Sequence, residues 1–144
     1  MRMLLACILA TAVPVVVSAQ QPQFLQVDPQ STRPFSPVVR VGNMLYLAGQ
    51  IATGKDGKVV PGGIAPETKQ VMENIKQVLE KAGSDLDHVV KCTVFLADMK
   101  EWDAMNEVYR TYFQKGRYPA RSAFGATGLA LDARTEIECI AVVK

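Results

Sequence analysis

The sequence predicts an α+β domain in which a single β-sheet carries two helices on one face. Strand-like and helix-like segments follow one another in the order strands, helix, strand, helix, strand. Each helical segment has one apolar face, so both helices should lie on the same side of one sheet. The length of 144 residues, with 49% hydrophobic and 21% charged residues, fits one globular domain.

Residues 1–19 differ from the rest of the chain and have the layout of a secretory signal peptide. The basic Arg2 precedes an apolar run, and small residues stand at the expected cleavage site. A membrane anchor is the alternative, but the run is short for a bilayer and Pro14 interrupts it. We therefore expect a secreted, periplasmic protein whose mature domain covers residues 20–144 and has no membrane association.

The first half of this domain predicts an extended lead-in, a hairpin and a helix. Residues 20–36 are rich in proline and glutamine and show no apolar period. The segments 38–41 and 44–50 flank a Gly-Asn pair, which is typical of a two-residue hairpin turn. At 66–82 apolar residues recur at helical spacing, with proline near the start and glycine just past the end.

The second half predicts a strand at 89–96, a helix at about 99–115 and a last strand at 135–143. Asp98 and Glu101 have capping-box spacing at the start of the helix. The apolar stripe of this helix is expected to face the core rather than to bind a ligand. It consists of Trp102, Met105, Tyr109 and Phe113. No helix remains for the second face of the sheet, which predicts self-association.

The charge balance argues against a polyanionic partner. The chain has a net charge of +2 at pH 7, which falls to +1 when the signal peptide and its Arg2 are removed. Aromatic residues make up only 7% of the chain, which is few for stacking on bases. We therefore expect no nucleic-acid partner.

Two cysteines remain in the mature domain, Cys92 and Cys139, and both lie on strand-like runs. Export permits a disulfide between them, while two buried free thiols are at least as good an explanation. The sequence leaves both cysteine states open. Together with the single histidine, His88, the cysteines lack the spacing of metal ligands, so no metal site is expected.

The segment 118–144 contains the residues best suited to chemistry. Pro119 predicts a turn that presents Arg121, and a loop containing Gly125 and Gly128 is expected to follow. The planar guanidinium of Arg121 suits two-point binding of a carboxylate. A solvated surface arginine is the plain alternative.

In the last strand, alternation places Glu136 and Glu138 on one face and Ile137, Cys139 and Ala141 on the other. For an isolated pair of carboxylates with this spacing, a solvent-exposed strand face is the better explanation. Their side-by-side placement disfavours a two-carboxylate glycosidase. A guanidinium and a carboxylate in one cleft would instead hold an anionic substrate and manage a water or a proton.

Four ordered segments carry a family resemblance, namely 46–51 (YLAGQI), 91–98 (KCTVFLAD), 119–122 (PARS) and 136–141 (EIECIA). Together they resemble the Rid (reactive intermediate deaminase) family, also called YjgF or L-PSP-like. The resemblance extends from about residue 34 to the last residue. It implies a chorismate-mutase-like protomer and a homotrimer with active sites in the clefts between subunits.

The resemblance also implies a function, the cofactor-independent hydrolysis of 2-imino acids to 2-oxo acids and ammonia. It assigns the substrate carboxylate to Arg121 and a positioned water to Glu136. The further substrate-binding residues that it implies are Phe35, Gly49, Asn106 and Ser122. For Asn106, a structural hydrogen bond from the helix to a neighbouring element is a slightly better explanation.

Three departures from the family pattern remove polar groups from the implied pocket. Phe35 stands where a tyrosine is usual, Ala48 replaces a serine and Ala123 replaces a cysteine. Substrate range and deaminase activity therefore stay open. The alternative functions are a non-catalytic binding or chaperone-like role and, less favoured, an endoribonuclease.

Overall fold

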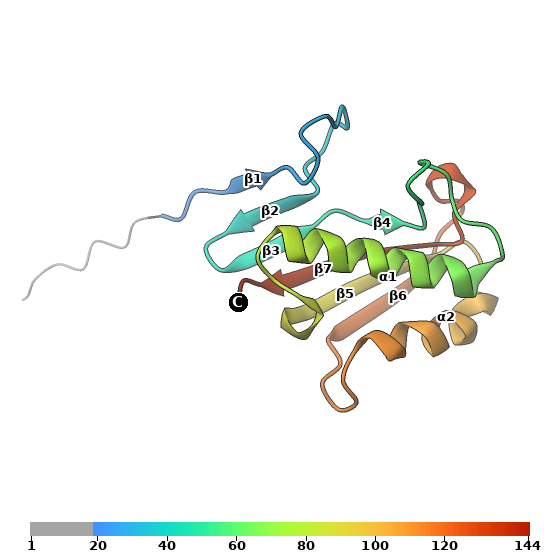
Figure 1. The fold of residues 1–144 in the computed structure, drawn as a ribbon. Coiled ribbons are helices and arrows are strands. Elements are labelled where there is room, and N and C mark those ends of the chain that lie inside the picture. Colours follow the sequence, from blue (N-terminus) through green and yellow to red (C-terminus); the bar gives the residue numbers. More distant parts are fainter. Residues whose placement is uncertain (1–18) are drawn as a thin grey trace, which may run out of the picture.

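The computed structural model describes residues 19–144, which form one β-sheet with both long helices on the same face (Figure 1). The predicted signal peptide lies outside the described residues, apart from its last residue. Among residues 19–144, none of the helices has the length and apolar character needed to cross a membrane. The α+β class predicted from the alternation of segments is confirmed.

The sheet has seven strands, and its centre is the last strand of the chain. The strands are β1 (Gln23–Leu25), β2 (Val38–Val41), β3 (Met44–Leu47), β4 (Gln50–Ile51), β5 (Val89–Leu96), β6 (Ala120–Gly125) and β7 (Thr135–Val142). Their order is β1-β2-β3-β7-β5-β6, and β4 also pairs with β7. All pairs are antiparallel except β5 with β6, which run parallel.

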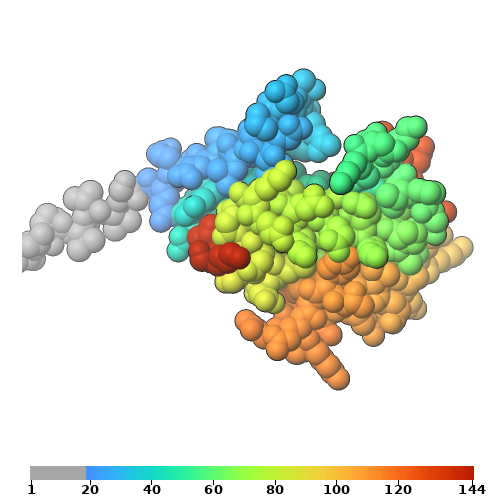
Figure 2. All heavy atoms as spheres, viewed as in Figure 1, coloured from blue at the N-terminus to red at the C-terminus, as the bar shows by residue number. Residues whose placement is uncertain are grey.

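The helices are α1 (Ile64–Lys81) and α2 (Trp102–Tyr109), with four short 3₁₀ turns between elements. These turns are Leu86–His88, Met99–Glu101, Arg110–Tyr112 and Ala130–Asp132. In the space-filling view, the segments of α1 and α2 conceal most of the sheet from this side (Figure 2). The predicted helix at 99–115 is therefore a shorter α-helix that tightens into a 3₁₀ turn at each end.

The core lies between the two helices and one face of the sheet. Ile137, Cys139 and Ala141 of β7 are buried there, while Glu138 is exposed on the opposite face. This confirms the alternation predicted for the last strand. The hairpin of β2 and β3, with its two-residue turn, and the strand at 89–96 are confirmed as well.

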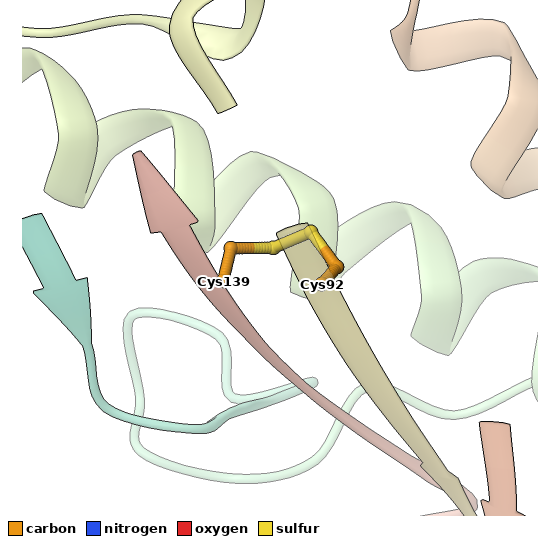
Figure 3. Close-up of a disulfide and its surroundings, with 2 residues drawn as sticks. All are labelled: Cys92 and Cys139. Atoms are coloured by element: carbon orange, nitrogen blue, oxygen red, sulfur yellow. A yellow bond between two sulfur atoms is a disulfide. The ribbon is translucent and has the colours of Figure 1, made fainter. Parts of the chain in front are cut away.

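The two cysteines form a disulfide between β5 and β7 (Figure 3). Cys92 and Cys139 are directly paired in the antiparallel register, and their Cα atoms lie 4.1 Å apart. Both side chains are buried. Of the two cysteine states that the sequence left open, the structure therefore has the disulfide.

The prediction of a turn at Arg121 was wrong, because residues 120–125 form strand β6, and the predicted loop begins only at residue 126, where it contains Gly128 but not Gly125. Each residue of β6 pairs with a residue of β5, from Lys91 with Ala120 to Leu96 with Gly125. Proline and glycine are local turn signals, but pairing with a long neighbouring strand overrides them. The predicted lead-in likewise contains a short edge strand, β1, which pairs with β2.

No helix of the described chain covers the second face of the sheet, which we call the open face. The register places Phe24, Tyr46 and Phe124 on this face, together with Glu136 and Glu138. These three aromatic side chains are 67%, 45% and 55% exposed, respectively. The open face is thus partly apolar, as expected of a surface that associates with another chain.

Candidate functional site

The structure of one chain places Arg121 and Glu136 on opposite faces of the sheet. Arg121 is the neighbour of Cys92 across β5 and β6, so its side chain points to the helix side. Glu136 pairs with Phe95, which faces the other way because it lies three positions beyond Cys92 on the same strand. The single cleft expected for the two groups is therefore not formed within one chain.

The guanidinium of Arg121 lies against aromatic rings of α2. Its Cζ atom is 4.7 Å from the ring centroid of Tyr109 and 5.9 Å from that of Trp102. Both distances lie within the range of attractive cation–π contacts. Trp102 is 39% exposed, so the predicted aromatic stripe is only partly core. Tyr109 is part of the core and also contacts the arginine, whereas Trp102 contacts it from a partly exposed position.

Arg121 opens into a cavity of about 500 Å³ that we call the arginine pocket. Its lining residues are Asn106, Tyr109, Arg110, Tyr118, Pro119 and Arg121. The lining contains two guanidinium groups and no carboxylate. Within residues 19–144, Arg121 takes part in no salt bridge. The pocket is therefore electrostatically suited to an anion.

Asn106 and Tyr109 contribute polar groups to the wall of this pocket. Asn106 is buried, and within residues 19–144 its side-chain amide makes none of the hydrogen bonds expected to neighbouring elements. Burial raises the pKa of Tyr109 to about 12, against a smaller lowering by the charge of Arg121. The hydroxyl of Tyr109 thus stays neutral over the physiological range, and the ring keeps the electron-rich face that Arg121 contacts.

Glu136 opens into a second cavity, of about 320 Å³, that we call the glutamate pocket. It is lined by Glu136 and Gly49, with Phe35, Gln50, Ile51 and Leu131 among its walls. A Cβ atom at position 49 would overlap the carboxylate of Glu136 and lie 2.9 Å from its Cδ. Gly49 therefore fixes the position of the carboxylate by leaving room for it.

A strained turn forms one wall of the glutamate pocket. Leu131 and Asp132 have φ values of 56° and 55°, in the left-handed region that non-glycine residues rarely adopt. The turn holds Leu131 63% exposed at the mouth of the cavity. Neither residue is glycine or asparagine, so the local sequence does not predict this wall.

Of the other predicted site residues, Phe35 joins the glutamate pocket and Ser122 joins neither pocket. Phe35 is half exposed, with the guanidinium carbon of Arg33 5.9 Å from its ring centroid. Ser122 lies on the open face, where its hydroxyl accepts a hydrogen bond of 3.0 Å from Lys91 Nζ. Ala123 shares the helix face with Arg121 and packs against the core.

Metal-ligating side chains do not gather anywhere in the described part of the chain, where no group of three or more is found. Residues that sequence reasoning missed are Arg110, Tyr118, Gln50 and Leu131. Arg110 could have been found from the sequence, because it directly follows Tyr109, a residue of the predicted aromatic stripe. Tyr118 and Gln50 stand directly beside the predicted residues Pro119 and Gly49, whereas Leu131 joins the glutamate pocket through packing between segments far apart in the chain.

Comparisons with known proteins show the family of the chain. Residues 25–143 match the model of the family described as Endoribonuclease L-PSP. The chain is 44% identical over 115 residues to a mouse protein named 2-iminobutanoate/2-iminopropanoate deaminase, covering 79% of this chain and 84% of that one. It is also 44% identical over 119 residues to a RutC family protein of Pyrococcus horikoshii, covering 82% and 94%.

Solved structures of similar proteins have the same fold as this chain. Yeast Mmf1 aligns with a TM-score of 0.75 and 37% identity, over 88% of this chain and 98% of that one. The YjgF gene product of E. coli aligns with a TM-score of 0.74 and 34% identity, over 81% and 93%. The family match covers nearly the whole described chain and includes both candidate pockets. The chain therefore belongs to the Endoribonuclease L-PSP family, the YjgF/Rid family that its motifs resemble.

Proposed function

We propose that this protein is a 2-imino-acid deaminase, which hydrolyses reactive imines to 2-oxo acids and ammonia. Support comes from relatives at 44% identity that are named 2-iminobutanoate/2-iminopropanoate deaminases. Arg121 and Glu136, the two residues that the family resemblance assigns to this chemistry, are both present and both open into cavities.

The observation that carries the proposal is that one chain holds two complementary half-sites. The arginine pocket is lined by two arginines and no carboxylate, while the glutamate pocket, which Arg33 also lines, presents a carboxylate that forms no salt bridge within residues 19–144. A complete site therefore needs the arginine pocket of one copy and the glutamate pocket of another. A homotrimer with sites between its subunits satisfies this need and would cover the partly apolar open face.

In this mechanism, Arg121 binds the substrate carboxylate through paired N–H donors. Backbone groups near Gly49 hold the imine nitrogen, while Asn106 and Phe35 line the site. Glu136 orients a water, accepts its proton as the water oxygen bonds to the imine carbon, and passes that proton to the imine nitrogen. In the resulting carbinolamine, the hydroxyl proton passes through Glu136 to the amino group as the C–N bond breaks, so ammonia leaves and the carbonyl of the 2-oxo acid forms. Positioning supplies most of the rate enhancement.

We further propose that the protein is exported after cleavage behind Ala19. The disulfide between Cys92 and Cys139 supports this, because disulfides persist mainly in oxidising compartments outside the cytoplasm. Intact-mass measurement of the mature protein from its host should find a chain that begins at Gln20 and is two hydrogens lighter than its reduced form. A cytosolic chain that retains Met1 would contradict the proposal.

The deaminase proposal is tested by supplying imines in place. An amino-acid oxidase generates the imine, and release of ammonia and 2-oxo acid is followed with and without the protein. We expect acceleration by the wild type and loss of it in Arg121→Lys and Glu136→Gln, with light scattering reporting three times the protomer mass throughout. A correctly assembled wild type that does not accelerate hydrolysis would refute the proposal.

RNA cleavage, which the family description names, forms a second arm of the same experiment. The near-neutral charge of the domain gives little electrostatic attraction to phosphates. We therefore expect no cleavage and no salt-dependent binding of single-stranded RNA. RNA cleavage that persists in the Glu136→Gln variant would favour a ribonuclease function over a deaminase function.

A further inference from the structure

We infer that the arginine pocket selects imino acids that carry a second carboxylate at the end of the side chain. This inference rests on the proposed function and specifies its substrate class. It starts from Arg110, which lines the same cavity as Arg121. An imino monocarboxylate uses only one of these two cations, whereas a dicarboxylate uses both.

Arg110 is held at the wall of the pocket by its own element. It is the first residue of the 3₁₀ turn that follows α2, and its Nε donates a hydrogen bond of 3.3 Å to the backbone oxygen of Asn106. Asn106 itself lines the cavity. The guanidinium is thus anchored at the pocket rather than being a freely rotating surface charge.

Arg110 already forms an ion pair with a carboxylate of the same chain. Glu107 Oε1 lies 3.1 Å from an Nη atom of Arg110, one helical turn away. Both side chains are more than half exposed, at 56% and 69%. Exposed pairs of this kind contribute little to stability and exchange readily with solvent or ligand. Glu107 therefore marks where a substrate carboxylate would bind and competes weakly for that position.

The cavity has the size and polarity for such a ligand. Its volume of about 500 Å³ lies within the range of small-molecule sites. The second carboxylate takes no part in bond making, since water still adds to the imine carbon and ammonia still leaves. It improves binding and orientation only, because a ligand held at both ends loses the freedom to rotate in the site.

The test compares two five-carbon product analogues that differ only at the far end, 2-oxopentanoate and 2-oxoglutarate. Binding is followed by the fluorescence of Trp102, the single tryptophan of the chain, whose ring centroid is 5.9 Å from the Arg121 guanidinium carbon. We expect 2-oxoglutarate to bind about five- to ten-fold more tightly, as one added charge-assisted contact provides. Equal or weaker binding of the dicarboxylate would overturn the inference.

Three surface variants distinguish a pocket effect from a general effect of charge. Arg110→Gln should abolish the preference for 2-oxoglutarate, and Glu107→Gln should increase it because Arg110 loses its competitor. Arg117→Gln removes the same charge from a nearby exposed residue outside the lining, so the preference should persist. Equal losses in the Arg110 and Arg117 variants would assign the preference to net charge and reject the pocket.

Turnover separates this inference from the proposed function. The imines of L-glutamate and L-norvaline, each generated by an oxidase, are hydrolysed in parallel assays. Faster hydrolysis of both, with a higher kcat/KM for the dicarboxylate, supports both proposals. Tight binding of 2-oxoglutarate without any turnover keeps the ligand class and refutes the deaminase. Turnover of both imines with equal kcat/KM keeps the deaminase and refutes the ligand class.

Discussion

The arginine pocket and the glutamate pocket position opposite charges by opposite means. Arg121 is held by side chains that are present, the rings of Tyr109 and Trp102 on α2. Glu136 keeps its position because residue 49 has no side chain, and only glycine there leaves space for the carboxylate. The first pocket therefore depends on packing from one helix, and the second depends on backbone geometry.

This difference determines which substitutions each pocket should tolerate. A guanidinium on an aromatic platform keeps its place as long as some ring remains below it. A carboxylate in close contact with backbone must move when even one methyl group is added. The following experiments test this contrast.

The largest effect is expected for Glu136→Gln, which keeps the size that fits against Gly49 but removes the proton acceptor. The kcat for imine hydrolysis should fall about 100-fold or more, as is typical for loss of a general base. The affinity for 2-oxo acids, measured by Trp102 fluorescence, should stay unchanged because the arginine pocket is intact. A parallel loss of affinity would mean that Glu136 also contributes to the binding of 2-oxo acids, which would then not be confined to the arginine pocket.

Arg121→Lys should show the converse pattern. Lysine keeps the charge but loses the planar pair of donors and the ring contact. We expect a loss of about 2–4 kcal/mol, or roughly 30- to 1000-fold in kcat/KM, with weaker binding of 2-oxo acids as part of it. Circular dichroism and light scattering should match the wild type. Wild-type kcat/KM in this variant would remove Arg121 from the site.

The disulfide connects the strand of Glu136 to the neighbour of the Arg121 strand, so its loss should affect both pockets. Cys92 and Cys139 are 47 positions apart, for which the loop-closure estimate gives a stabilisation of about 4 kcal/mol. Urea unfolding of the double variant Cys92→Ala, Cys139→Ala should reveal this loss. The reduced wild type serves as a second comparison, and an unchanged midpoint in both would contradict the expectation.

Gly49→Ala tests the glutamate pocket without touching its charge. The added methyl group must displace Glu136, so we expect kcat to fall about ten-fold while 2-oxo acid affinity is retained. Gly128→Ala is the matched control, because a Cβ there meets no atom within 4 Å and its φ is not positive. Equal activities of the two variants would show that the close contact is irrelevant to function.

The smallest effects are expected at Tyr109. Tyr109→Phe keeps the ring and removes a buried hydroxyl that has no hydrogen-bond partner within the described chain, so 2-oxo acid affinity should be unchanged. Tyr109→Leu removes the platform, and affinity should fall about three- to five-fold. Because burial raises the pKa of Tyr109 to about 12, wild-type affinity should be flat between pH 6 and 9. If Tyr109→Leu binds 2-oxo acids as tightly as Tyr109→Phe does, the contact of the ring with Arg121 does not contribute to affinity.

Strongly periodic segments of the fold could be predicted from sequence, and edge segments could not. The helix at 66–82 and the strands at 89–96 and 135–143 have long patterns that only one element satisfies. Strand β6 has six residues, directly follows Pro119 and ends at Gly125, so its local signals indicate a turn. Only the register with β5, which is a tertiary property, makes it a strand.

The candidate site followed the same rule. The family motifs identified Arg121 and Glu136, but their faces depend on the pairing of β6 with β5 and of β5 with β7. Their separation within one chain was therefore not predictable without the strand register. The grouping of Arg121 with Arg110, and the wall formed by Leu131, likewise depend on contacts between distant segments.

The position of β7 in the sheet has a consequence for hydrogen exchange. β7 is bonded to β3 and β4 on one side and to β5 on the other, whereas β6 has β5 as its only neighbour among the described strands. Amide hydrogens of β7 should therefore exchange with deuterium mainly through global unfolding, and those of β6 through local opening. The carboxylate that would orient water is carried by the rigid centre of the sheet. The guanidinium that would bind the substrate is carried by its more deformable edge.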